Sequence, residues 1–253
     1  MIFIWYNKFK NIKCISKMIC ASFDIGKKNF AFYIESFNPD NLPSQQQVVF
    51  NKDGTPCEKT RSIIDNVCKE GKTLLHRNYD LSLLLDNNTK KKQKQSSENK
   101  IKDYQLFYHM TLILDKYKEF WIKCDYFVIE QQMCFQSVRN TLAVKLAQHC
   151  FSYFTIFYGD IQKNKIIEFP AFFKTQLLGA PKIKGNKVYK NGNHSWKSMT
   201  KPARKKWAIK KATEIFKLRN EDNIMEQHKK KDDLADTLIQ LQAFKIQQFV
   251  KKV

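Results

Sequence analysis

ICASFDIGKKNFAFYIES, residues 19–36, is the stretch from which the fold can be inferred. It contains two short runs of β-branched and aromatic residues separated by the turn-like segment 26–29 (GKKN), a pattern that predicts a β-hairpin. Asp24 stands near the end of the first strand, between Phe23 and Ile25. An ionised carboxylate in such surroundings is costly to bury unless it is paired or binds a metal ion. The alternative is a turn residue that caps the following loop.

Downstream of the hairpin, the hydrophobic pattern predicts further strands and helices. Residues 47–51 are a candidate third, edge strand, and residues 52–100, with the polar and cationic run TKKKQKQSSENK, are interpreted as an insertion with one or two short helices. The later segments predict a helix at 101–122, a strand at 125–130, a helix at 136–158, a strand at 165–169 and two helices at 204–218 and 232–250. This order is that of an RNase H-like α/β domain, with a mixed five-stranded sheet and helices on both faces.

The charge of the chain points to a polyanionic partner. Lys and Arg number 45 against 24 Asp and Glu, and the net charge of +21 exceeds what solubility requires. The segment 169–213 contains no acid and twelve Lys or Arg, and within it residues 180–203 are interpreted as a mobile basic loop, an insertion in the domain. Nucleic acid is the leading candidate partner, although AT-rich codon usage explains part of the excess of Lys.

The cysteines, the hydrophobic runs and the N-terminal residues indicate the compartment in which the protein is expected to act. The seven cysteines form no CxxC pair and no zinc-like spacing, and their odd number favours reduced thiols in an intracellular protein; they are residues 14, 20, 57, 68, 124, 134 and 150. No apolar run reaches the roughly 18 residues needed to span a bilayer. Residues 1–17 carry four Lys and no acid, and we interpret them as a dispensable extension or a targeting segment ahead of one domain at 18–253.

Four acids are expected to converge in a fold of this order. Glu130 ends the strand DYFVIE, and ligands gather at strand ends in α/β sheets. Asp233 and Asp236 are three residues apart, so their carboxylates share one helix face. Asp232 is expected to be the N-terminal acid favoured by the helix dipole, with a role as substitute ligand left open.

Asp24, Glu130, Asp233 and Asp236 are the predicted metal ligands. Several oxygen donors without soft ligands suit Mg²⁺, with Mn²⁺ as a substitute. Two such ions about 4 Å apart can activate a water and stabilise the leaving oxygen in phosphodiester hydrolysis.

The acids also lie in motifs that resemble those of a known family. FDIGKKNFAFYI, VIEQQM followed by RNTLAVKLAQ, and DDLADTL resemble, in order, the three acidic motifs of RuvC-like Holliday junction resolvases, and the poxvirus-type and fungal mitochondrial members are the most similar. The family pattern falls on the same four acids. FPAFFKTQLLG, residues 169–179, looks like the family's strand, Lys, short helix and Gly element, which implies that Lys174 lies beside the scissile phosphate. The insertion, the basic loop and the extension depart from the pattern.

The resemblance implies a magnesium-dependent endonuclease that cuts four-way DNA junctions by paired hydrolysis. Such a junction has approximate two-fold symmetry, which implies a homodimer, and the apolar helix around 136–157 is the candidate interface. Phe135 is a candidate wedge at the crossover or an ordinary core residue. The candidate phosphate contacts are Arg139, Lys182, Lys184, Lys187, Lys190, Lys197 and Arg204.

Two other functions compete with this one. The first is another RNase H-fold nuclease, acting on RNA:DNA hybrids, ribosomal RNA precursors or transposon ends. The second is a non-catalytic basic protein that packages DNA, against which the isolated acids in apolar strands speak. The resemblance favours a viral factory in the host cytoplasm or nucleus as the compartment, with the mitochondrion as the alternative.

Overall fold

A five-stranded mixed sheet forms the centre of the fold. The computed structural model describes residues 17–83, 102–132, 140–159, 165–189, 192–227 and 230–251. The strands are β1 (Met18–Ile25), β2 (Phe30–Phe37), β3 (Lys72–Tyr79), β4 (Tyr126–Gln131) and β5 (Lys165–Pro170), and their order in the sheet is β3-β2-β1-β4-β5. β1 pairs antiparallel with β2 and parallel with β4, while β3 and β5 form the edges. This arrangement confirms the predicted RNase H-like fold class.

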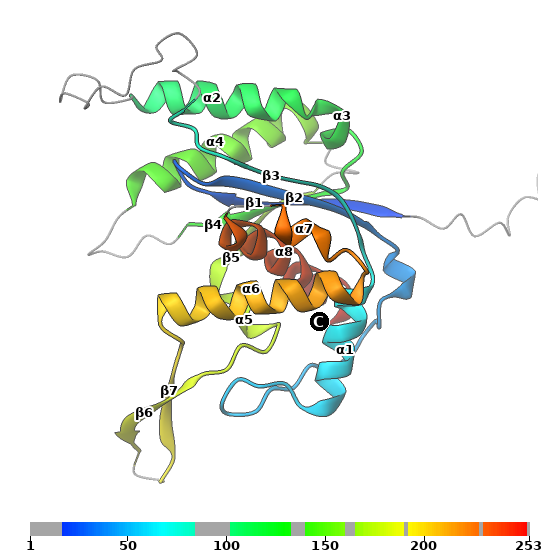
Figure 1. The fold of residues 1–253 in the computed structure, drawn as a ribbon, viewed down its shortest axis with the longest axis vertical. Coiled ribbons are helices and arrows are strands. Elements are labelled where there is room, and N and C mark those ends of the chain that lie inside the picture. The colour runs from blue at the N-terminus through cyan, green and yellow to red at the C-terminus, as the bar shows by residue number, and fades with distance from the viewer. Residues whose placement is uncertain are drawn as a thin grey trace, which may run out of the picture.

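Helices cover both faces of the sheet (Figure 1). One face carries α2 (Asp103–Lys116), α3 (Lys118–Trp121) and α4 (Thr141–Tyr158). The other carries α1 (Glu58–Lys69), α5 (Ala171–Gln176), α6 (Lys201–Leu218), α7 (Asn223–Glu226) and α8 (Lys231–Lys245), which continues as a π-helical turn at Ile246–Val250. A short 3-10 turn, Pro39–Asn41, follows β2. Both faces of the central strands are therefore buried.

The side-chain alternation of β1 and β4 decides which residues face α8. Cys20 in β1 and Val128 in β4 pack in the core on the α8 side, whereas Phe23 and Ile129 pack in the core on the α2 and α4 side. Successive side chains of a strand point to opposite faces. Asp24, four residues after Cys20, therefore belongs to the α8 side of the sheet.

α8 is the central helix of its layer, and every residue from Thr237 to Lys245 is buried. Gln240 fixes its height over the sheet, because its side-chain amide donates hydrogen bonds to the Ser22 hydroxyl and to the carbonyl oxygens of Phe23 and Val128 at 3.0–3.1 Å. The helix therefore runs across β1 and β4 with its N-terminal half near their carboxyl ends.

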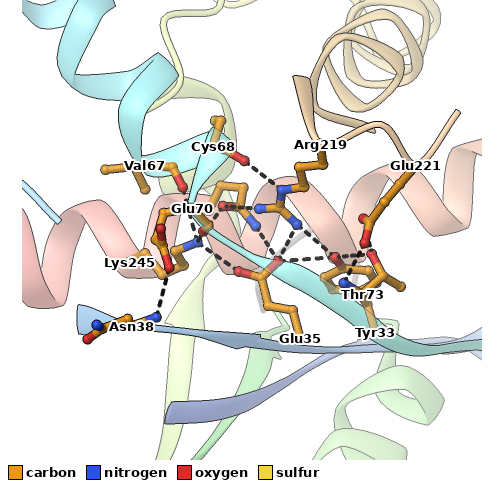
Figure 2. Close-up of polar contacts among 11 residues, drawn as sticks. Tyr33, Glu35, Asn38, Val67, Cys68, Glu70, Thr73, Arg219, Glu221 and Lys245 are labelled. Carbon is orange, nitrogen blue, oxygen red and sulfur yellow. Dashed lines mark hydrogen bonds and ion pairs between the residues drawn. The ribbon is translucent and has the colours of Figure 1, made fainter. Parts of the chain in front are cut away.

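A buried ionic cluster holds the C-terminal end of α8 (Figure 2). The Glu35 carboxylate of β2 accepts hydrogen bonds from Lys245 and Arg219, each at 2.8 Å, and from Gln242 at 2.9 Å. Lys245 also donates to the carbonyl oxygens of Val67 and Glu70, and Arg219 to that of Cys68, so that the end of α1 is joined to the same cluster. We call Glu35, Arg219, Gln242 and Lys245 the Glu35 cluster.

Two predictions about the fold were wrong in part. The third strand is β3 at Lys72–Tyr79, inside the segment interpreted as an insertion, and residues 47–51 make only an isolated bridge, between Phe50 and Pro56. The basic segment predicted as a loop contains a two-stranded hairpin, β6 (Ile183–Val188) with β7 (His194–Lys197), which projects from the body of the protein. β3 is an edge strand with alternating exposure, so its hydrophobic signal is weak.

No helix in the described parts of the chain is long and apolar enough to span a membrane. Cys20, Cys57, Cys68, Cys124 and Cys150 are free thiols, and all but Cys57 are buried. Burial raises the pKa of the Cys20 thiol above its usual range, so this cysteine behaves as a small apolar side chain. Cys14 and Cys134 lie outside the described residues.

Candidate functional site

Three acids and one lysine meet where β1 and β4 end beneath α8. The parallel register aligns Phe23 with Ile129, so the next residues, Asp24 and Glu130, are neighbours on the α8 side. Their carboxyl groups share a hydrogen bond. Asp236 reaches the same place from α8, and its charge acts on Asp24. Of the four acids expected to converge, the structure brings these three together.

Lys174 of α5 completes the cluster. Its ammonium nitrogen lies 2.9 Å from Glu130 Oε1, and the Lys174 side chain is only 7% exposed. A buried ammonium group needs negative partners, and Glu130 is the first of them. Pro170 ends β5 and opens α5, which brings Lys174 back towards the end of β4. We call Asp24, Glu130, Lys174 and Asp236 the acidic cluster.

The acidic cluster holds more negative charge than its own lysine neutralises. Burial raises the pKa of Asp24 well above its usual range, and the neighbouring Glu130 raises it further. Burial also raises the pKa of Asp236, where Lys174 acts in the opposite direction. The pKa of Glu130 is lowered in spite of burial, because Lys174 and the hydrogen bond with Asp24 stabilise its charge. The two carboxyl groups of the pair therefore shift in opposite directions, the pKa of Asp24 upwards and that of Glu130 downwards.

Lys174 stays charged in this environment. Burial alone would lower its pKa, but the carboxylates of Glu130, Asp24 and Asp236 raise it above the usual range. An amine held as a cation among three acids can contact an anionic substrate only if its partners release it or if the substrate approaches between them.

The other two acids of α8 lie beside the cluster. Asp233 is 4% exposed and accepts a hydrogen bond from the Asn78 side chain of β3 at 2.6 Å. Asp232 pairs with Lys205 of α6 at 2.5 Å. The charged groups that act most on Asp233 are Asp232, Lys230 and Lys205, so Asp233 borders the acidic cluster.

Asn78 and Lys205 are polar partners of the site that the sequence did not reveal. Asn78 lies in β3, within the segment interpreted as an insertion. The run KTLLHRNY after Gly71 was the available signal, since it contains a short apolar pair and an aromatic end. Lys205 lies among six other cationic residues of α6, and only its contact with Asp232 distinguishes it.

The predicted DNA contacts fall in three groups. Lys184, Lys187 and Lys197 lie on the β6–β7 hairpin, and Lys182 immediately precedes it. Arg204 lies in the first turn of α6, close enough to Glu130 to lower the pKa of that acid. The remaining three, Phe135, Arg139 and Lys190, lie outside the described residues.

The donor chemistry of the acidic cluster fits a hard divalent cation. Its possible donors are carboxylate oxygens, which Mg²⁺ and Mn²⁺ prefer. Burial raises the pKa of Asp24 and of Asp236, and the neighbouring Glu130 raises both further, so a cation bound there would stabilise the ionised carboxylates. Among the described residues, no three His, Cys, Asp or Glu side chains are already arranged around one metal position. The Lys174 ammonium group supplies the positive charge beside Glu130.

The topology and the acidic cluster define the class of this protein: an RNase H-like α/β fold with carboxylates gathered at the ends of its central strands. No family model matches the chain. Uncharacterized protein 170L of Invertebrate iridescent virus 6 is 34% identical over 235 residues, covering 89% of this chain and 87% of that protein. Uncharacterized protein 97L of Invertebrate iridescent virus 3 is 31% identical over 230 residues, covering 88% and 98%. The chain belongs to the family of these two viral proteins.

Two solved structures are similar to this chain over most of its length. The fowlpox virus Holliday junction resolvase is 15% identical with a TM-score of 0.41, and the match covers 92% of this chain and all of that one. The RuvC of Thermus thermophilus is 10% identical with a TM-score of 0.45, and the match covers 92% and 99%.

Proposed function

We propose that this protein is a metal-dependent endonuclease that resolves four-way DNA junctions. The observation that carries the proposal is the acidic cluster: three carboxylates and a buried lysine converge at the ends of β1 and β4 in a protein with a net charge of +21. A purely structural or packaging protein does not require three buried carboxylates that share a single ammonium group. Perturbed acids in a substrate-accessible place are typical of catalytic sites.

Asp24, Glu130 and Asp236 would hold the metal, and Asp233, released from Asn78, would be the fourth ligand. Two bound Mg²⁺ ions, or Mn²⁺ in their place, would supply the Lewis acidity for phosphodiester hydrolysis. Lys174 supplies a fixed positive charge beside the reacting phosphate. Glu130 orients this lysine through their 2.9 Å contact, and we expect Lys174 to stabilise charge that grows on the phosphate oxygens.

DNA would be bound through its backbone by the basic hairpin and the start of α6. Lys182, Lys184, Lys187 and Lys197 have no acidic residue between them in sequence. Tyr189 and Trp196 are also exposed there, at 50% and 38%. Such a surface favours affinity that depends steeply on salt and little on sequence, and the exposed aromatic rings suit bases that are not fully stacked.

A pair of cuts on a two-fold symmetric junction requires two sites related by a dyad. α4 lies on the side of the sheet opposite to α8 (Figure 1), and it exposes Ile156 and Phe157 by 74% and 64%. We therefore propose a homodimer through this helix. Sedimentation equilibrium of the wild type and of Phe157→Asp tests it, because a dimer through α4 should become monomeric in the variant.

A cleavage panel tests the activity. Labelled four-way junction, linear duplex, flap and RNA:DNA hybrid are incubated with the protein, with and without Mg²⁺ and with Mn²⁺. We expect paired, symmetric nicks in the junction only when a metal is present. Asp24→Asn, purified in parallel, controls for a contaminating nuclease. Cleavage of the RNA:DNA hybrid in preference to the junction would favour the other RNase H-type activity, and binding without any cleavage would favour packaging.

The substrate class also suggests where the protein acts. Its two relatives are proteins of invertebrate iridescent viruses, and branched DNA arises where a viral genome is replicated and recombined. We propose the sites of viral DNA synthesis in the host cell as its compartment. Localisation of the tagged protein relative to newly made viral DNA tests this.

A further inference from the structure

A cavity of about 540 Å³ opens directly beside the acidic cluster. Glu130, Lys174 and Asp236 form one of its walls, so the cavity and the cluster share these side chains. The remaining walls come from α5, from the loop around residue 50, from the start of α6 and from the C-terminal Lys251. Residues 47–51 were predicted as an edge strand, and two of them, Val48 and Phe50, instead line the cavity.

The lining of the cavity combines apolar side chains with cations. Phe50, Phe172, Leu177, Met199 and Ile239 supply the apolar surface. Ile239 and Leu177 are buried, while Phe172 is 45% exposed and its ring lies 4.4 Å from that of Phe173. Besides Lys174, the cations of the lining are Lys182, Arg204 and Lys251, and within the part of the chain that the structure describes its acids are Glu130 and Asp236.

These features define the ligand by its chemistry. Apolar and aromatic side chains suit a flat, uncharged ring, and the three further cations of the lining suit the phosphates on either side of that ring. Because Lys174 lines the cavity as well as the acidic cluster, a ring held there would belong to a nucleotide next to the phosphate that Lys174 is proposed to contact.

We infer that the cavity receives one unstacked nucleobase, from a nucleotide flanking the scissile phosphate. A base in the cavity would fix the register of the strand on the acidic cluster, and it would be available only where stacking is already weak, as at a branch point. The inference rests on the proposed function, because it takes the strand in the site to be the strand that is cut.

The test is a cycle that combines a change in the protein with a change in the DNA. Phe172→Ala removes an exposed ring from the cavity with little risk to folding. The change in the DNA is an abasic residue, which removes one base. It is placed on either side of the mapped cut site. If no cut is seen, it is placed at positions across the branch point. Tyr108→Ala is the matched control, because Tyr108 is 61% exposed on α2, which covers the other face of the sheet.

Binding is measured by fluorescence anisotropy without divalent ions, so that no cleavage interferes. We expect Phe172→Ala to weaken binding to the intact junction about tenfold, as loss of one stacked base commonly does. It should have no further effect on a junction that is abasic at the recognised position. Tyr108→Ala should bind both DNAs like the wild type. Equal weakening on both junctions, or none on either, overturns the inference.

The outcomes separate this inference from the proposed function. A protein that cuts junctions but shows independent effects of Phe172→Ala and the abasic residue keeps the nuclease activity and loses the base site. A protein that cuts no DNA but shows coupled effects keeps the base site and loses the nuclease activity. If it neither cuts DNA nor shows coupling, both are wrong.

Discussion

Two buried groups of charges lie near opposite ends of α8, and they differ in how well they are neutralised. In the Glu35 cluster, one carboxylate meets Arg219 and Lys245, and each of its oxygens accepts hydrogen bonds. In the acidic cluster, three carboxylates meet a single ammonium group, that of Lys174. Both groups lie on the same side of the same sheet. The surrounding fold therefore does not dictate that buried charges be balanced.

The pKa values express this difference. Burial opposes ionisation of Glu35, yet Arg219 and Lys245 lower its pKa from 4.5 to about 2. Burial raises the pKa of Asp24, and its nearest neighbour, Glu130, adds to the effect. A satisfied buried group stabilises the fold, whereas an unsatisfied one is retained for what it binds. The comparison predicts that substitutions in the two clusters will have opposite consequences for activity and stability.

The largest effect is expected from Asp24→Asn and Asp236→Asn. Each should abolish junction cleavage, because loss of a ligand removes the metal while the basic surface remains. Junction affinity should stay within several-fold of the wild type, and thermal stability should be equal or higher, since a buried like charge is removed. Cleavage assays, anisotropy and thermal melts measure the three quantities. Cleavage near the wild-type rate by either variant would disprove the site.

Glu35→Gln should have the opposite profile. The substitution leaves Arg219 and Lys245 buried without their counter-charge, and breaking a buried pair in this way destabilises by about 3–5 kcal/mol. Chemical denaturation measures the loss. Lys145→Gln is the control, because its ion pair with Asp103 is about half exposed and such pairs contribute at most about 1 kcal/mol. Where the Glu35→Gln protein is folded, its single-turnover cleavage should match the wild type; a catalytic defect there would break the comparison.

The same carboxylate predicts how stability depends on pH. The pKa of Glu35 is lower in the folded protein, at about 2, than the ordinary value of 4.5. Its contribution is therefore fully present above about pH 4.5 and is lost as the pH falls towards 2. Linkage over this interval corresponds to about 3 kcal/mol. The difference in unfolding free energy between wild type and Glu35→Gln should shrink across this range. A constant difference from pH 6 to pH 2.5 would show that Glu35 does not titrate as the structure implies.

Lys174→Ala should lower the single-turnover rate at saturating protein by roughly 10²-fold, the effect expected of one well-placed group that stabilises transition-state charge. The combined replacement of Lys182, Lys184, Lys187 and Lys190 should instead weaken junction binding and reduce its salt dependence, with the saturated rate nearly unchanged. If Lys174→Ala loses only affinity, Lys174 is one more phosphate contact and its burial among the acids has no catalytic meaning.

The acidic cluster could be predicted from the sequence, and the Glu35 cluster could not. Asp24 and Glu130 interrupt or end apolar strands, and Asp236 lies beside the apolar stripe of its helix, so each is conspicuous by itself. Glu35 and Lys245 are 210 residues apart, and nothing in the local pattern of either indicates that it is buried. Asn78 was missed for a related reason: β3 is a half-exposed edge strand with a weak period, and its contact with Asp233 arises only in the folded protein.

The smallest effect is expected from removing residues 1–17, since the residues that define the two clusters all lie after Met18. β1 begins at Met18, and the first hydrogen bond that fixes it, from the backbone amide of Ile19 to the Asp125 carboxylate at 2.8 Å, is retained in a protein that starts at Met18. Met18 pairs with Phe37 at the end of β2, so the hairpin that carries Asp24 and Glu35 is also complete without the extension. We therefore expect the truncated protein to cut junctions at the wild-type rate and to unfold at the same denaturant concentration. The cleavage rate and the denaturant midpoint test different parts of this expectation. A loss of stability with normal cleavage would indicate that the extension packs near the Glu35 end of the sheet. A stable but inactive protein would instead make the extension part of the DNA-binding surface or of the acidic cluster's surroundings.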